Sequence, residues 1–321
     1  MADVWTMGEL LVEVMRPGRG ALLSETGTFL GPFPSGATGI FIDTIARLGH
    51  SAAIISGVGD DDFGRCILNR FRKDGVNTEM VLVVPNKTTG VAFVTYFEDG
   101  SRRFLYHWDH TPAVMARAPD ADVIRDPRFF HIMGCSLMPN EGFRSEVFKA
   151  VEVFARKGAK VSFDPNIRFE LLGGRNAEGI LQPLMDQCSI LLPGERELQL
   201  LTGTDNTKDA LAKALRYPRM EIVVLKRGSQ GATVFDGTRS IDVPAYKVDE
   251  TDPTGAGDCF DAGFICGLLE GKAVKDCAEI ASAAGALNAM AFGPMEGDIS
   301  PATIAALRER APRRVGPQRG A

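Results

Sequence analysis

Hydrophobic and polar positions alternate in blocks along most of this chain. The run SAAIISGVG at residues 51–59 predicts a buried strand, and residues 61–75 predict a helix that ends at Gly75. The apolar face of that helix is formed by Phe63, Ile67, Leu68 and Phe71. Three later runs, KGAKVSFDPN, QCSILLPGE and MEIVVLKRG, predict further short strands, each followed by turn-forming or charged residues.

Helical periodicity over 141–157 and 207–216 separates those strands. The repeated order of strand, helix and strand predicts an α/β fold, with a mostly parallel sheet and helices on both of its faces. Ligands of such sheets bind at the carboxyl ends of the strands. We therefore expect the segments DPN, PGERE and KRGSQG, which follow the strands, to surround the site.

Two segments break this rhythm. Residues 88–108 alternate like two strands joined by the turn EDG, and residues 10–35 are strand-like with Gly and Pro turns. We expect both, within about 10–35 and 88–110, to form a small sheet that acts as a lid on a single domain spanning 1–321. The basic end, 309–321, is expected to be a solvated and flexible tail.

Composition and charge exclude several classes of function. The 321 residues are 45% hydrophobic and 24% charged, and the net charge of -5 offers no basic field for nucleic acid or a membrane surface. No apolar run approaches the roughly 20 residues of a membrane span, and MADVWTMGELLVEV does not resemble a signal peptide, so we expect a cytoplasmic protein. Six scattered cysteines without a C-x-x-C pair favour reduced, buried thiols over disulfides or a zinc site.

The stretch TDPTGAGDCFDAGF at 251–264 is the strongest candidate for chemistry. Gly255 and Gly257 let a ligand approach the backbone, and the following residues predict a helix whose N-terminal amides favour an anion such as a phosphate. Asp258 in its first turn serves either as a plain helix cap or as a general base that deprotonates an attacking hydroxyl. The residues alone leave both interpretations open.

Other glycine-rich stretches do not match common nucleotide motifs. GVGDDDFG lacks the third glycine of a dinucleotide fingerprint, and no G-x-x-x-x-G-K-[ST] occurs. Together, however, DPTGAGDCFDAGF, GVGDDDFG, FDPNIR, the early MGELLVEV and the late GPMEG resemble the ribokinase (PfkB) family of carbohydrate kinases in order and spacing. The resemblance spans nearly the whole chain and implies a ribokinase-like three-layer α/β/α fold with a small β-sheet lid. GPFPSGATGIFID further resembles a ketohexose (tagatose or fructose) kinase subgroup.

The resemblance implies roles for the residues of the opening loop. Asp258 is the base that deprotonates the sugar hydroxyl, while Asp252 and Thr254 belong to the phosphate and cation region. The amides of the anion hole for the transferred phosphoryl group are those of Gly255, Ala256 and Gly257. ATP and Mg²⁺ are the implied cofactors, and some family members also bind a monovalent cation such as K⁺ here.

The nucleotide region is expected in two further segments. In LKRGSQG, the candidates are Lys226, Gly228 and Gly231, although a hairpin turn explains these residues equally well. On a late helix, Asn288 is the candidate polar contact to adenine.

Three positions depart from the family pattern. In PGERE, Glu197 is expected to reach magnesium indirectly through water, but Gly194 stands where the family has asparagine, which puts nucleotide affinity in question. At the sugar end, the early aspartate is replaced by Glu13, and Ile40 replaces an asparagine that contacts hydroxyls. Gly36 remains where the backbone passes close to the sugar.

The lid and the FDPNIR segment bear on the choice of sugar. Asn166 and Arg168 are assigned to the substrate. Members that bind acid sugars carry Tyr-Arg on the second lid strand, where this chain has His107 and Trp108, so a neutral sugar is favoured. Arg168 or the lid arginines at 102–103 could compensate. Trp108 either stacks on the sugar or fills the lid sheet.

The sequence therefore predicts an ATP-dependent sugar kinase that phosphorylates a neutral ketohexose-like substrate and forms a homodimer through the lid. The alternatives are a 2-keto-3-deoxygluconate kinase, a nucleoside kinase and a non-catalytic pseudokinase that binds sugar or nucleotide. The departures at Glu13, Ile40 and Gly194 motivate the pseudokinase, whereas the retained Asp258 and its G-A-G crown speak against it.

Overall fold

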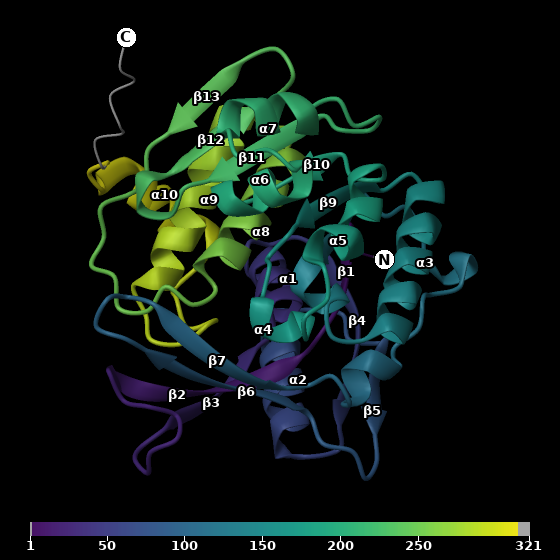
Figure 1. Cartoon of the computed structure of the whole chain (residues 1–321), viewed down its shortest axis with the longest axis vertical. Helices are drawn as coiled ribbons and strands as arrows, with labels where there is room; N and C mark the ends of the chain where they lie inside the picture. The colour runs from purple at the N-terminus through teal and green to yellow at the C-terminus, as the bar shows by residue number, and fades with distance from the viewer. Residues whose placement is uncertain (1, 314–321) are drawn as a thin grey trace.

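Two sheets of different size organise the computed structural model, which describes residues 2–313 (Figure 1). The described part of the larger sheet has nine strands in the order β13-β12-β11-β10-β9-β8-β1-β4-β5, parallel except where β12 pairs with β11 and β13. Its strands are β1 (Val4–Met7), β4 (Ala52–Gly59), β5 (Val81–Val84), β8 (Phe129–Met133), β9 (Lys160–Asp164), β10 (Ile190–Leu191), β11 (Ile222–Lys226), β12 (Ala232–Phe235) and β13 (Ser240–Val243).

Helices cover both faces of this sheet and create two separate cores. One face carries α1 (Ala37–Arg47), α2 (Asp62–Asp74), α8 (Ala256–Leu269), α9 (Val274–Ala289) and α10 (Pro301–Arg310). The other face carries α3 (Glu141–Arg156), α5 (Ala177–Met185), α6 (Glu195–Thr202) and α7 (Thr207–Ala214), and the single turn α4 (Phe169–Leu172) lies near the lid. The predicted three-layer α/β/α fold with a mostly parallel sheet is confirmed.

The predicted helices correspond closely to observed ones because their end signals are strong. The helix expected over 61–75 is α2, where the Asp61 side chain accepts a hydrogen bond from the Gly64 amide and Gly75 adopts φ 89°. Those expected over 141–157 and 207–216 are α3 and α7, each begun by an asparagine cap.

The smaller sheet lies over one end of the larger one, at the bottom of Figure 1. Its order is β3-β2-β6-β7, with β2 and β6 parallel and the outer pairs antiparallel. Its strands are β2 (Leu11–Arg19), β3 (Leu30–Ser35), β6 (Gly90–Tyr96) and β7 (Arg102–His107). The inner side of this lid sheet has its own apolar cluster, which includes Leu11, Met15, Val94 and Trp108.

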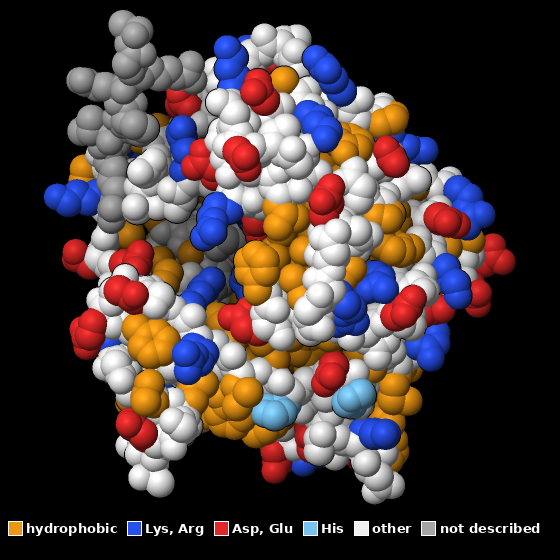
Figure 2. Space-filling model, viewed as in Figure 1, with side chains coloured by type: hydrophobic (Ala, Val, Ile, Leu, Met, Phe, Trp, Pro, Cys, Tyr) orange, Lys and Arg blue, Asp and Glu red, His pale blue; other side chains and the backbone are white. Residues whose placement is uncertain are grey.

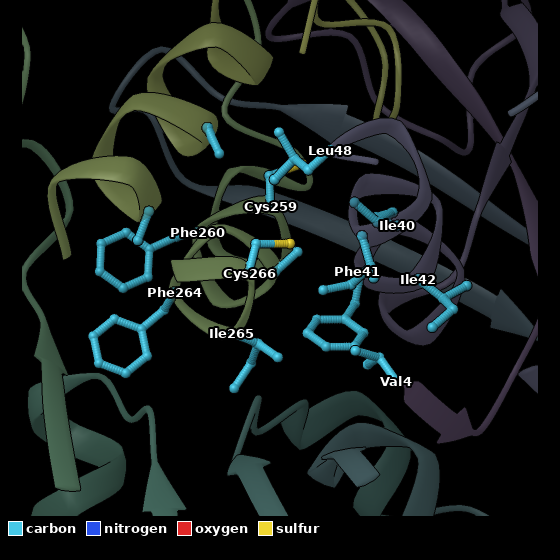
Figure 3. Close-up of a cluster of buried hydrophobic side chains, with 14 of the residues drawn as sticks. Val4, Ile40, Phe41, Ile42, Leu48, Cys259, Phe260, Phe264, Ile265 and Cys266 are labelled. Carbon is cyan, nitrogen blue, oxygen red and sulfur yellow. The ribbon is translucent and has the colours of Figure 1, made fainter. Parts of the chain in front are cut away.

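The core between α1 and α8 fixes the helix that begins at the G-A-G loop. Figure 3 shows Ile40 and Phe41 on the α1 side, with Ile265 and Cys266 on the α8 side. Against α9, a Cβ on Gly263 would lie only 2.8 Å from the Ala281 Cα, so glycine permits close helix packing. The six cysteines are unpaired and five are buried, as the sequence predicts.

The C-terminal end differs in part from the expectation of a flexible tail. Residues 309 and 310 belong to α10, and the Arg313 guanidinium packs 3.6 Å from the ring centre of Tyr246. The start of the predicted tail is thus helical and packed, because Arg313 finds an aromatic face and the Pro244 carbonyl. Positions 314–321 lie outside the described residues. Within residues 2–313, no helix is long and apolar enough to cross a membrane.

Candidate active site

A cavity of about 880 Å³, open to solvent, lies between the lid and the carboxyl ends of the central strands. Figure 2 shows a hollow on this face between lid and body. The end of β9, the end of β11 and the N-terminus of α8 all reach it, as expected for a mostly parallel sheet. Predicted site residues that line it are Glu13, Gly36, Trp108, Asn166, Arg168, Glu197, Lys226, Thr254, Gly255, Gly257 and Asp258.

The G-A-G loop needs glycine at its first position. Gly255 caps α8 with φ 77°, and a Cβ there would lie 2.3 Å from the Pro294 carbonyl oxygen. The amides of Gly255 and Gly257 have no acceptor within residues 2–313, whereas the Ala256 amide donates to the Pro253 carbonyl at 3.2 Å. The loop thus presents unpaired donors at a helix N-terminus, the arrangement that binds an anion.

Asp258 lies in the first turn of α8, is 8% exposed and faces the cavity. The Asn166 side chain donates to its Oδ1 at 3.0 Å. Burial and the nearby Asp164 raise the pKa of Asp258 to about 7, against the opposing charges of Arg168 and Lys226. A carboxyl group that is half ionised near neutral pH, beside an anion site, is suited to general base catalysis.

Asp252 organises the loop from behind instead of lining the cavity. Its carboxylate accepts from the Thr254 amide at 3.0 Å, the Thr254 hydroxyl at 2.7 Å and the Gly293 amide at 2.9 Å. A fourth donor is the Tyr96 hydroxyl of β6, at 2.5 Å. Tyr96 was not singled out by the sequence, and its contact ties the lid to the loop. A cation role for Asp252 stays a prediction.

A second cavity of about 940 Å³ adjoins the first and fits the expected nucleotide region. Lys226, Gly228 and Gly231 line it together with Tyr246 and Gly285. Lys226 also lines the first cavity, as Gly257 and Pro253 do. The second cavity therefore borders the first at the start of α8, beside the unpaired amides of the G-A-G loop.

Asn288 differs from the sequence-based expectation. Its side chain is fully buried and donates to the Thr254 carbonyl at 2.7 Å and the Pro294 carbonyl at 3.0 Å. It does not line the second cavity, so the structure gives it the task of holding the G-A-G loop and not that of an adenine contact. Helical periodicity could not reveal this, because both acceptors lie in loops outside the helix, and Thr254 is 34 positions away in sequence.

Glu197 also has a backbone-holding task. Its Oε2 accepts from the Gly194 amide at 2.7 Å and its Oε1 from the Ile167 amide at 2.8 Å, while burial raises its pKa. Residues 2–313 contain no group of three or more His, Cys, Asp or Glu side chains arranged to hold a metal ion. A magnesium ion held mainly by nucleotide phosphates and water needs no such group, and the indirect role of Glu197 stays a prediction.

The sugar end holds two buried glutamates. Glu13 is 5% exposed, accepts from the Ser35 hydroxyl at 2.6 Å, and has no partner within the described residues for its Oε2. Burial raises its pKa to about 7. Glu9, which the sequence reasoning missed, accepts from the Ala37 amide at 3.0 Å and from Ser136. Its signal was a carboxylate inside the apolar run MGELLVEV.

Strand alternation decides which lid residues face the first cavity. The even positions of the second lid strand, Arg102, Phe104, Tyr106 and Trp108, line the first cavity. His107 is on the other face and contacts Phe93, and Arg103 packs over Phe97. Trp108 is only 1% exposed and packs in the lid core, so it does fill the lid sheet, and stacking on a sugar stays a prediction.

Comparison with known proteins agrees with this fold and site. The model of the pfkB family carbohydrate kinases matches residues 34–300. Fructokinase-1 from Oryza sativa subsp. japonica is 31% identical over 300 residues, covering 90% of this chain and 92% of that protein. The chain belongs to the PfkB family and is a carbohydrate kinase.

Solved structures extend the comparison. A protein from E. coli provisionally named Ribokinase II, crystallised with ATP and Mg²⁺, has a TM-score of 0.90 and 37% identity, covering 96% of this chain and 99% of its own. Fructokinase from Vibrio cholerae O395, bound to fructose, ADP and calcium ion, has a TM-score of 0.82 and 25% identity, with coverage of 96% and 99%. A double mutant of that fructokinase was crystallised with fructose, ADP and potassium ion.

Proposed function

We propose that this carbohydrate kinase transfers the γ-phosphoryl group of ATP to a hydroxyl of a neutral ketohexose such as fructose or tagatose. The observation that carries the proposal is the buried Asp258, with its pKa near 7, at the N-terminus of α8 and facing the first cavity. The fructokinase relatives support the ketohexose as substrate.

The reaction needs only one proton acceptor and fixed donors. The Asp258 carboxylate takes the proton of the sugar hydroxyl as its oxygen forms the new bond to phosphorus and the bond to the ADP oxygen breaks. The unpaired amides of Gly255 and Gly257 stabilise charge on the phosphoryl oxygens. Magnesium would bind to the nucleotide phosphates and supply counter-charge, with Glu197 near its water shell.

The sugar would lie in the first cavity beneath the lid. The unpaired Oε2 of Glu13 is a buried acceptor that a sugar hydroxyl can satisfy, and Gly36 keeps the backbone close. At Gly36, a Cβ would lie 2.6 Å from the Glu9 carbonyl oxygen, so a larger residue would displace the wall of the site. Lid residues cover the sugar and exclude water, which limits hydrolysis of ATP.

A specific observation favours a second candidate, 2-keto-3-deoxygluconate kinase activity. Arg102 and Arg168 both line the first cavity, so positive charge is present although the family's acid-binding Tyr-Arg pair is absent. A guanidinium is the preferred partner for a sugar carboxylate. The neighbouring Glu13 and Asp258 work against a second anion, and the neutral ketohexose remains the first candidate.

A panel assay tests the proposal. ADP release with Mg–ATP would be measured over ketohexoses, aldoses, 2-keto-3-deoxy acids and nucleosides, with Arg102→Gln measured beside the wild type. We expect a kcat/KM for fructose or tagatose at least tenfold above every acid or nucleoside, with little change in R102Q. A preference for a keto acid that R102Q abolishes would establish the second candidate. Nucleoside turnover, or ligand binding without any turnover, would overturn the proposal.

Two finer features belong to the same proposal. Leu22, Leu30 and Leu105 of the lid region are 38–49% exposed, and burying them between two lids would give a homodimer. Light scattering should give twice the monomer mass for the wild type and a monomer for Leu105→Glu.

A monovalent cation would act near the G-A-G loop, so replacing K⁺ with tetramethylammonium should reduce kcat; unchanged kcat would argue against such a site.

A further inference from the structure

A buried charge cluster lies where the two cavities meet. The Lys226 ammonium nitrogen is 2.7 Å from Asp164 Oδ2 and 3.1 Å from each carboxylate oxygen of Asp261. The side chains are 17%, 4% and 0% exposed, respectively. A structural ion pair needs one carboxylate for each ammonium, whereas this cluster has two carboxyl groups around one ammonium. Burying the additional carboxyl group costs free energy of folding.

Three elements far apart in the chain build the cluster. Asp164 ends β9, Lys226 ends β11, and Asp261 lies one turn after the base Asp258 on α8. A Cβ on Gly257 would lie 3.9 Å from the Lys226 nitrogen, so the ammonium stands beside the G-A-G crown. Lys226 also lines both cavities, which places its charge on the path between the nucleotide and the sugar.

The cluster is linked to the base as well. The second oxygen of Asp164 accepts from the Asn166 amide at 3.1 Å, which holds Asn166 at φ 37°. The Asn166 side chain in turn donates to Asp258. Asp164 therefore fixes the ammonium with one oxygen and the turn that reaches the base with the other.

The three groups shift one another's pKa values. Burial and Asp164 raise the pKa of Asp261 despite Lys226. Burial would also raise the pKa of Asp164, but Lys226 and hydrogen bonds hold it below its usual value. Burial would lower the pKa of Lys226, but the two acids outweigh it and raise that pKa. Because its pKa is raised, Lys226 keeps its positive charge beside the two acids and can attract a phosphate.

We propose that Lys226 contacts the phosphoryl group in transfer, and that Asp261 is a positioning residue that acts through Lys226. An ammonium has three N–H donors, and the two equidistant oxygens of Asp261 can share one. With another donated to Asp164, the third is free for a phosphoryl oxygen. The inference rests on ATP as the phosphoryl donor in the proposed function, and not on the identity of the sugar.

Binding measurements test the contact without any sugar. Titration calorimetry would compare Mg–ADP with a non-hydrolysable Mg–ATP analogue in the wild type and in Lys226→Met. We expect K226M to weaken the analogue at least tenfold and Mg–ADP less than threefold. Equal losses for both ligands, or no loss, would overturn the contact. Should K226M fail to fold, Lys226→Gln, whose amide can still donate to Asp164, carries the same expectation.

A double-mutant cycle tests the role of Asp261. We expect Asp261→Asn to lower kcat about tenfold or more with little change in the KM for the sugar, and to have no further effect when K226M is already present. Additive losses in the double variant would overturn action through Lys226. The matched control is Asp43→Asn, which removes another fully buried acid, paired with Arg70, and should alter stability but neither the ligand ratio nor kcat.

If the wild type binds Mg–ATP but phosphorylates no ketohexose, the proposed substrate is wrong. The calorimetric comparison would still decide the role of Lys226.

Discussion

At the residue scale, the site depends on Asp258, a carboxyl group whose pKa is raised to about 7. An aspartate at the surface of a protein is fully ionised at pH 7 and holds protons weakly, so it is a poor base. Burial of Asp258, with Asp164 nearby, strengthens its affinity for the proton it must accept.

The pKa of Asp258 predicts the acid limb of the rate profile. Because the base must be ionised, kcat/KM should fall towards tenfold per pH unit below about pH 7 and be nearly flat from pH 8 to 9. Initial rates of ADP release in buffers of constant ionic strength give the profile. An acid limb near pH 4, the ordinary range of aspartate, would contradict this environment for the base.

Gly255, at the N-terminal end of α8, offers a second test, with a matched control just beyond the other end of that helix. Gly255→Ala adds the cost of a positive φ, about 1–2 kcal/mol, and a clash with the Pro294 carbonyl, and should lower kcat at least a hundredfold. Gly271→Ala has a similar φ of 70° but open space around its Cβ, and should lose stability while keeping kcat. Thermal unfolding and ADP release separate the two. Equal activity of the variants would show that the close approach at the loop is unimportant.

At the element scale, the lid is joined to the phosphoryl site by one side chain. The last residue of β6, Tyr96, reaches Asp252 across 156 positions of sequence and also contacts Thr254. Burial and the Asp252 charge raise the pKa of Tyr96 well above its usual range, so it is a permanent donor. The position of the lid and the shape of the loop are therefore coupled.

We expect Tyr96→Phe to loosen the lid without removing any apolar surface. The KM for the sugar should rise three- to tenfold with a smaller fall in kcat, and the free energy of unfolding should fall by about 1 kcal/mol. Tyr217→Phe is the control, because within residues 2–313 its hydroxyl bonds to Gln182 alone, on the sheet face opposite α8. A loss of stability with unchanged KM would mean that the contact is structural alone.

The sequence predicts elements well and contacts poorly in this protein. Helix α2 and strand β4 have strong local periodicity and end signals, so their positions were predictable. The partner of Asp252 and the burial of Asn288 depend on groups brought together only by the completed fold. The lid register shows the same limit, since a shift of one residue exchanges Arg103 for Arg102 at the cavity.

At the scale of the whole molecule, function and stability oppose each other. Glu13, Asp43 and Asp258 have pKa values raised from about 4 to about 7, mainly by burial. Between those values the folded state holds protons that the unfolded state has released, so stability falls as pH rises from about 4 to 7. His131, with its pKa lowered to about 3 by burial, acts in the opposite direction up to about pH 6.5.

The three carboxyl groups outweigh the one histidine, and the raised pKa values of Glu197 and Asp261 act in the same direction, so we expect a net loss of stability with rising pH. The Tm should be higher at pH 6 than at pH 8. Asp43→Asn should reduce that difference, because Asp43 is the one of the three groups that lies outside the site. Differential scanning calorimetry at fixed ionic strength measures both. A Tm that rises from pH 6 to pH 8 would mean that these carboxyl groups are ionised in the folded protein.

The raised pKa of Asp258 also means that ionising this group lowers the free energy of unfolding. Asp258→Asn removes a group that is difficult to ionise, and we expect it to be at least as stable as the wild type at pH 8. Any loss of activity in this variant therefore reports on chemistry and not on folding.

The most direct test of the central claim is the rate of ADP release with Mg–ATP and a saturating ketohexose, measured for the wild type and Asp258→Asn. We predict turnover by the wild type and a kcat at least a thousandfold lower in D258N, with the affinity for Mg–ADP retained. A variant that keeps more than a tenth of the wild-type kcat would contradict Asp258 as the base, and with it the account of this site.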